Sequence, residues 1–91
     1  MGYTWSDFKA VANRDKHGVT FEEACTCFDD PWHVVLFDPD HSDHEERELL
    51  IGHSSKGRLL IVSYTSRGFV TRIISARRAT TRETKTYAQG I

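Results

Sequence analysis

The 91-residue chain suits one small domain, and its 38% hydrophobic and 27% charged residues are an ordinary globular balance that excludes an intrinsically disordered chain. It has no apolar run near the roughly 20 residues of a membrane helix and no hydrophobic signal region, so we expect a cytoplasmic protein without a membrane partner. The net charge of −1 hides an uneven distribution: residues 1–53 carry twelve Asp or Glu against four Lys or Arg, whereas residues 54–91 carry eight Lys or Arg against one acid.

The first predicted helix follows a short apolar start. Ser6 is a good N-cap, and Gly18 can adopt the left-handed conformation that ends a helix. Between these two residues, Phe8 and Val11 recur at helical spacing. The pattern therefore predicts a helix that runs as far as His17.

A second helix is predicted to begin at Thr20. Residues 20–23 have the capping-box form, in which the Thr20 hydroxyl accepts a hydrogen bond from the Glu23 amide and the Glu23 carboxylate reaches back. We expect apolar side chains such as Phe21 and Ala24 to face inward. Pro31 ends the segment because proline has no amide hydrogen to continue the helix.

The rest of the chain predicts β-strands and one last helix. The β-rich segments are residues 32–37, 46–54, 58–65 and 69–76, with a polar turn at residues 38–43. Their connections are too short for parallel crossovers, so we expect antiparallel pairing. Thr80 and Glu83 form a second capping-box signature, which opens a helix up to about Ala88. The order β-α-α-β-β-β-β-α predicts a single α+β domain over residues 1–91.

Arginines gather around the last predicted hairpin. They are Arg67, Arg72, Arg77 and Arg78, with Arg82 just beyond. A guanidinium binds two phosphate oxygens at once and stays charged, so this group predicts a phosphate-binding surface or a docking site for an acidic partner. The alternatives are that the arginines discourage pairing at a sheet edge, or that the two halves of the chain neutralise each other. Regular alternation would put Arg72 and Arg77 on opposite faces.

Several side chains are candidates for proton transfer or base stacking. Histidine is the side chain suited to proton transfer at neutral pH, so His17, next to Lys16, and His53 are candidates. Lys16 and His17 also suit a helix C-terminus, and His53 also suits a core or edge position. Glu83, the only acid of the basic half, is a candidate base whose spacing also suits helix capping. Tyr87 could stack on an RNA base or cover the sheet.

The sequence predicts no metal and no other cofactor. Cys25 and Cys27 are two residues apart on a predicted helix, so their thiolates point to different sides and cannot chelate one ion. Together with His41, His44 and His53 they match none of the usual zinc patterns.

Blocks along nearly the whole chain resemble one known family. They are KHGVTFEEA (16–24), FDDP (28–31), DHS (40–42) with EER (45–47), IGxS (51–54), and RIISARRAT (72–80) with Glu83 and Tyr87. In order and spacing these blocks are similar to the BrnT family of bacterial toxins. The resemblance carries functional roles onto the polar positions Lys16, His17, Arg47, Arg77, Arg78 and Glu83.

The resemblance implies a RelE-like fold, with an antiparallel four- to five-stranded sheet packed against two N-terminal helices and a short C-terminal helix. It also implies an RNA-cleaving toxin of a type II toxin–antitoxin system that arrests translation and growth. The implied partner is a BrnA-like antitoxin of the ribbon-helix-helix type, in a 2:2 hetero-assembly that represses the shared operon. In that assembly the chain meets operator DNA only through the antitoxin.

The resulting hypothesis is a metal-independent endoribonuclease that leaves a 2′,3′-cyclic phosphate. The catalytic candidates are Lys16, His17, Arg47, His53, Arg77 and Glu83, and the RNA-binding candidates are Arg67, Arg72, Arg78, Arg82 and Tyr87. A base would activate the ribose 2′-hydroxyl, and arginines would stabilise the charge on the phosphorane. The rival hypothesis is a non-catalytic module that only binds the antitoxin and acts as co-repressor.

Overall fold

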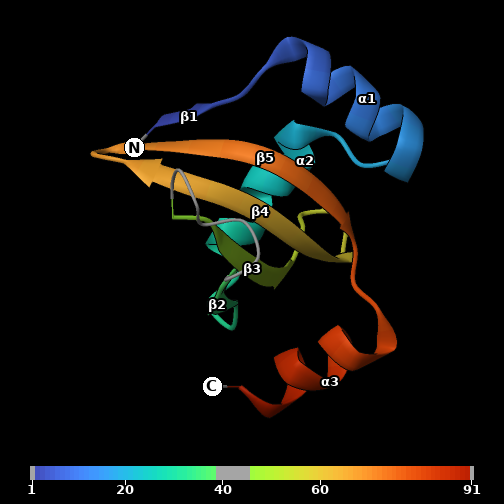
Figure 1. The fold of residues 1–91 in the computed structure, drawn as a ribbon. Coiled ribbons are helices and arrows are strands. Elements are labelled where there is room, and N and C mark those ends of the chain that lie inside the picture. The colour runs from blue at the N-terminus through green and yellow to red at the C-terminus, as the bar shows by residue number, and fades with distance from the viewer. Residues whose placement is uncertain (1, 39–45, 91) are drawn as a thin grey trace.

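The computed structural model describes residues 2–38 and 46–90. Its elements are β1 (Gly2–Thr4), α1 (Asp7–His17), α2 (Phe21–Thr26), the 3₁₀ turn η1 (Cys27–Asp29), β2 (Val34–Phe37), β3 (Glu48–His53), β4 (Leu59–Arg67), β5 (Val70–Arg78) and α3 (Thr81–Gln89) (Figure 1). The α+β class and the order of elements are confirmed. Most of the predicted polar turn, with His41 and His44, lies outside the described residues.

The five strands form one sheet in the order β1-β5-β4-β3-β2. The three hairpin pairs from β2 to β5 are antiparallel, as predicted from their short connections. The edge strand β1 differs, because it pairs in parallel with β5, where Gly2 lies opposite Val70. Parallel pairing is possible here because the intervening chain is long enough for a crossover.

The predicted helix caps are present. The Ser6 hydroxyl accepts a hydrogen bond from the Lys9 amide at 3.3 Å, and Gly18 ends α1 with φ of 69°. The Thr20 hydroxyl accepts from the amide of Glu23 at 3.1 Å, so half of the predicted capping box forms. The Glu23 carboxylate does not reach back to the cap, because it forms an ion pair with Arg58. None of the described helices is long and apolar enough to cross a membrane.

The main core lies between one face of the sheet and the two N-terminal helices (Figure 1). Phe21 and Ala24 are fully buried against it, as predicted for α2. In α1 the apolar residues behave differently, since Phe8 is 83% exposed and Val11 also faces solvent. The buried side chain of α1 is the polar Asn13.

Asn13 anchors α1 to the edge of β5. Its amide nitrogen donates hydrogen bonds to the Ala76 carbonyl at 2.8 Å and to the Val19 carbonyl at 2.9 Å. Its amide oxygen accepts from the Ala76 backbone N–H at 3.0 Å. The side chain thus takes the place of a neighbouring strand beyond the end of β1, and satisfies buried backbone groups that would otherwise destabilise the fold.

Candidate functional site

A bulge in β5 decides which arginines can act together. Ser63 of β4 pairs with Ser75, whereas Tyr64 pairs with Ile73, which leaves Ile74 as an extra residue on β5. One extra residue reverses the alternation of side chains beyond it. The regular alternation expected from the sequence is therefore wrong for this strand.

The bulge brings Arg72 and Arg77 onto the same face of the sheet. Arg72 lies opposite Thr65, and Arg77 lies opposite Ile61, and these two β4 residues are four positions apart on one face. That face is turned away from α1 and α2. Leu60 and the other β4 residues of the main core are at the alternate positions of the strand, so they point to the opposite side, toward these helices. We call the face that carries Arg72 and Arg77 the arginine face.

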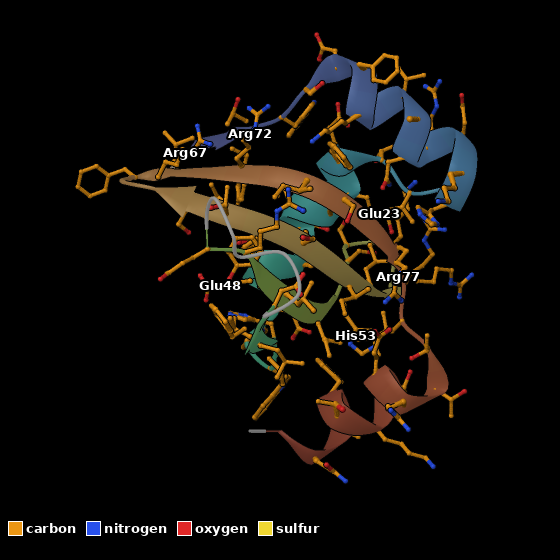
Figure 2. All side chains as sticks on the ribbon, in the orientation of Figure 1. Glu23, Glu48, His53, Arg67, Arg72 and Arg77 are labelled. Carbon is orange, nitrogen blue, oxygen red and sulfur yellow. The ribbon has the colours of Figure 1, made fainter. Side chains whose placement is uncertain are left out.

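Three more predicted residues belong to the arginine face by register. Arg67 and Leu59, the partner of His53, are at β4 positions that alternate onto this face, and Arg67 itself pairs with Val70. Arg47 directly precedes Glu48, whose β4 partner lies on the helix-covered side, so Arg47 lies on the other side. The members of the face are therefore Arg47, His53, Arg67, Arg72 and Arg77. Figure 2 shows Arg67 and Arg72 near the β4–β5 turn, and Arg77 and His53 toward α3 at the other end.

Arg77 is held by α3. Its two terminal nitrogens donate to the two carboxylate oxygens of Glu83 at 2.9 and 2.8 Å, and Nη1 also donates to the Arg78 carbonyl. Three of the five guanidinium N–H groups are used in this way, and the side chain is 41% exposed. The remaining Nε–H and Nη2–H lie side by side, in the arrangement that binds two oxygens of one phosphate.

Glu83 has a structural task that makes it a poor general base. It completes the predicted capping box by accepting from the Thr80 amide at 2.8 Å while its own amide donates to the Thr80 hydroxyl. The hydrogen bonds from Arg77, helped by Thr80 and opposed by burial, lower the pKa of Glu83. A carboxylate with a lowered pKa holds a transferred proton weakly.

His53 belongs to a hydrogen-bonded cluster with Asp30 and Tyr87. Its Nδ1 lies 3.0 Å from the Tyr87 hydroxyl, which donates to Asp30 Oδ2 at 2.7 Å. The same carboxylate oxygen accepts from the His53 backbone N–H at 2.8 Å. The Asp30 side chain is 7% exposed and that of His53 is 47% exposed, so the imidazole has a buried anchor and an accessible ring.

The helix α3 contacts both the arginine and the imidazole. Glu83 holds Arg77, and Tyr87 contacts His53, and these two α3 residues are four positions apart. Side chains with this spacing are neighbours on a helix, with Cβ atoms about 5–6 Å apart. One helical turn of α3 therefore contacts both the Arg77 guanidinium and the His53 ring.

A buried ion pair fixes the chain next to His53. The Glu23 carboxylate, 2% exposed, bonds the Arg58 guanidinium and accepts from the Ser54 hydroxyl at 2.7 Å. The hydrogen bonds from Arg58, opposed by burial and helped by Ser54, lower the pKa of Glu23. Because Ser54 follows His53 directly, this network ties the end of β3 to α2.

Four predicted residues lie elsewhere. Lys16 and His17 line a shallow groove between α1 and β5, with Ile74 and Ser75 among the other lining residues. This groove shares no residue with the Arg77–Glu83 or His53–Tyr87 contacts. Arg78 pairs with Leu60 and so belongs to the opposite side of the strand, and Arg82 is exposed on α3. Functional roles for these four residues stay predictions.

Sequence reasoning missed Asp30 and Arg58. Asp30 directly precedes the proline that was predicted to end the second helix, and its position in the FDDP block is the one signal of a further role. Arg58 had no local signal, because its partner Glu23 is 35 residues away in the chain. Among residues 2–38 and 46–90, no group of three or more His, Cys, Asp or Glu side chains could hold a metal ion.

Comparisons with known proteins point to one family. Residues 5–83 match the sequence model described as the ribonuclease toxin, BrnT, of a type II toxin–antitoxin system. The structure is similar to the 1.1 Å crystal structure of the Brucella abortus ribonuclease toxin BrnT, with a TM-score of 0.61 and 23% identity over 89% of this chain and 99% of that one. At this identity the likeness shows a shared fold. No curated protein matches the chain.

Proposed function

Because the chain belongs to the BrnT family of ribonuclease toxins of type II toxin–antitoxin systems, we propose that it is an endoribonuclease that cuts RNA without a metal ion. The RNA backbone lies along the arginine face. The scissile phosphate is bound between Arg77 and His53, at the end of the sheet next to α3.

In the proposed reaction, His53 takes the proton of a ribose 2′-hydroxyl, and the 2′-oxygen attacks the adjacent phosphorus. A bond forms between phosphorus and the 2′-oxygen, and the bond to the 5′-oxygen breaks. The departing oxygen takes up a proton from solvent, which leaves a 2′,3′-cyclic phosphate and a 5′-hydroxyl. The Arg77 fork binds the non-bridging oxygens, where negative charge increases in the transition state.

The observation that carries this proposal is the double attachment of α3. Through Glu83 it holds Arg77 in one orientation, and through Tyr87 it contacts the ring of His53. Preorganised donors next to a general base are what internal transesterification requires, because no external nucleophile has to be bound. Arg72, whose β4 partner is four positions from that of Arg77 and so about 14 Å away at roughly 3.4 Å per residue, is placed to meet a neighbouring part of the RNA backbone.

The test is cleavage of RNA by the purified chain in the presence of EDTA. We expect cleavage at an unchanged rate, with products that carry a 2′,3′-cyclic phosphate and a 5′-hydroxyl. These ends are identified by mass spectrometry and by phosphorylation of the new 5′ end. Loss of cleavage in EDTA that Mg²⁺ restores, or products with a 5′-phosphate, would contradict the mechanism.

We further propose that cleavage arrests translation and growth in the cytoplasm. A BrnA-like ribbon-helix-helix antitoxin would neutralise the chain in a 2:2 assembly and carry it to operator DNA as a co-repressor. Absence of growth arrest when the chain is expressed alone, together with antitoxin binding, would favour the non-catalytic alternative.

A further inference from the structure

We propose that Asp30 and Tyr87 are positioning residues that fix the proton of the neutral His53 ring on Nδ1. This leaves Nε2 as the nitrogen that accepts the 2′-hydroxyl proton. The inference rests on the proposed function, because it assigns the orientation of the base in that reaction. Neither positioning residue needs to touch RNA.

The first argument is a count of protons. A tyrosine hydroxyl has one hydrogen, and the Tyr87 oxygen lies within hydrogen-bond distance of both Asp30 Oδ2 and His53 Nδ1. An ionised carboxylate is a stronger acceptor than a neutral imidazole nitrogen, so Tyr87 donates to Asp30. The remaining bond can form only if Nδ1 carries a hydrogen and donates it to the Tyr87 oxygen.

The protonation states of the two partners are consistent with this direction. Burial would raise the pKa of Asp30, but hydrogen bonds from the amides of His53 and Trp32 and from the Tyr87 hydroxyl lower it overall. Burial, followed by the hydrogen bond to Asp30 and its charge, raises the pKa of Tyr87 to about 12. Near neutral pH, Asp30 is therefore an anion and Tyr87 keeps its proton.

The second argument is the position of the ring. The ring of His53 meets the ring of Tyr87 edge-on, with centroids 5.0 Å apart and planes at 80°. Asp30 is anchored by two backbone N–H donors, so the cluster is fixed from its buried side. After proton transfer the imidazolium lies 3.7 Å from the Asp30 carboxylate, measured from Nδ1 to Oδ2, and the negative charge stabilises it.

The first test reads the tautomer directly in the intact chain. Long-range ¹H–¹⁵N NMR of histidine-labelled protein, at a pH where His53 is neutral, distinguishes a protonated ring nitrogen from an unprotonated one. The signal is assigned by its loss in His53→Gln. We expect Nδ1 to carry the hydrogen and Nε2 to lack it. The reverse pattern would overturn the inference, and this measurement requires no cleavage activity.

The second test compares Tyr87→Phe with the matched control Tyr3→Phe, which removes a hydroxyl remote from His53. We expect Tyr87→Phe to move His53 toward the Nε2–H tautomer and to lower kcat about 10- to 100-fold, a part of the 10²- to 10⁴-fold typical of a general base. We expect KM to change less than twofold, and the control to change neither quantity. An unchanged tautomer and kcat in Tyr87→Phe would contradict the inference.

The outcomes separate the inference from the function on which it rests. Cleavage at the full rate by His53→Gln would overturn the role of His53 and its positioning residues, and would leave the endoribonuclease proposal standing. Failure of the intact chain to cut any RNA would overturn both proposals.

Discussion

Arg77→Ala is expected to slow RNA cleavage about 10²- to 10³-fold, which corresponds to about 2.7–4 kcal/mol of transition-state stabilisation. The reason is that Glu83 holds the guanidinium so that Nε–H and Nη2–H remain available to a phosphate. The quantity to measure is the single-turnover rate at saturating protein, which separates the chemical step from RNA binding.

The control for this variant is Lys85→Ala, which removes an exposed cation of α3 and leaves the Arg77 contacts in place. We expect it to cut at close to the unaltered rate. The helix should persist in Arg77→Ala because Glu83 still accepts from the Thr80 amide, and circular dichroism checks this. A folded Arg77→Ala variant with unaltered cleavage would remove the arginine from the mechanism.

Asn13→Ala is expected to lower the free energy of unfolding by about 3 kcal/mol. The substitution leaves the Ala76 N–H and carbonyl and the Val19 carbonyl without their partner. Each unsatisfied buried group costs about 1–3 kcal/mol, and entry of water offsets part of the sum. For a domain of total stability about 5–15 kcal/mol, this is a large loss that urea denaturation can measure.

Arg14→Ala is the matched control, because the neighbouring side chain is exposed and makes only a surface ion pair with Asp15 at 3.7 Å. Such pairs contribute about 0–1 kcal/mol. If Asn13→Ala unfolded at the same urea concentration as Arg14→Ala, the anchoring of α1 by a polar side chain would be wrong.

The helix boundaries could be predicted because their signals are local. A capping hydroxyl and the amide that it accepts from are three residues apart, as in Ser6 with Lys9 and Thr80 with Glu83. The β-hairpins could be predicted in the same way, because the short polar turns between the strands are also local signals. The resemblance to a known family then supplied the functional hypothesis that local patterns could not supply.

The geometry of the site could not be predicted because it depends on distant contacts. The extra residue Ile74 moves Arg77 to the face of Arg72, and no turn signal or glycine marks this bulge. Asn13 is a polar residue whose partner Ala76 is 63 residues away. Asp30 likewise meets Tyr87 only across the folded chain. Each of these roles is set by packing between elements.

The position at which RNA binds is the most direct test of the proposed active site. A short RNA with a 2′-O-methyl group at the cleavage position lacks the attacking hydroxyl and can be titrated into ¹⁵N-labelled protein without being cut. We expect the NMR signals of Arg77, His53 and the N-terminal turn of α3 to shift most. Shifts confined to the α1 groove of Lys16 and His17, with the arginine face unchanged, would contradict the proposed site.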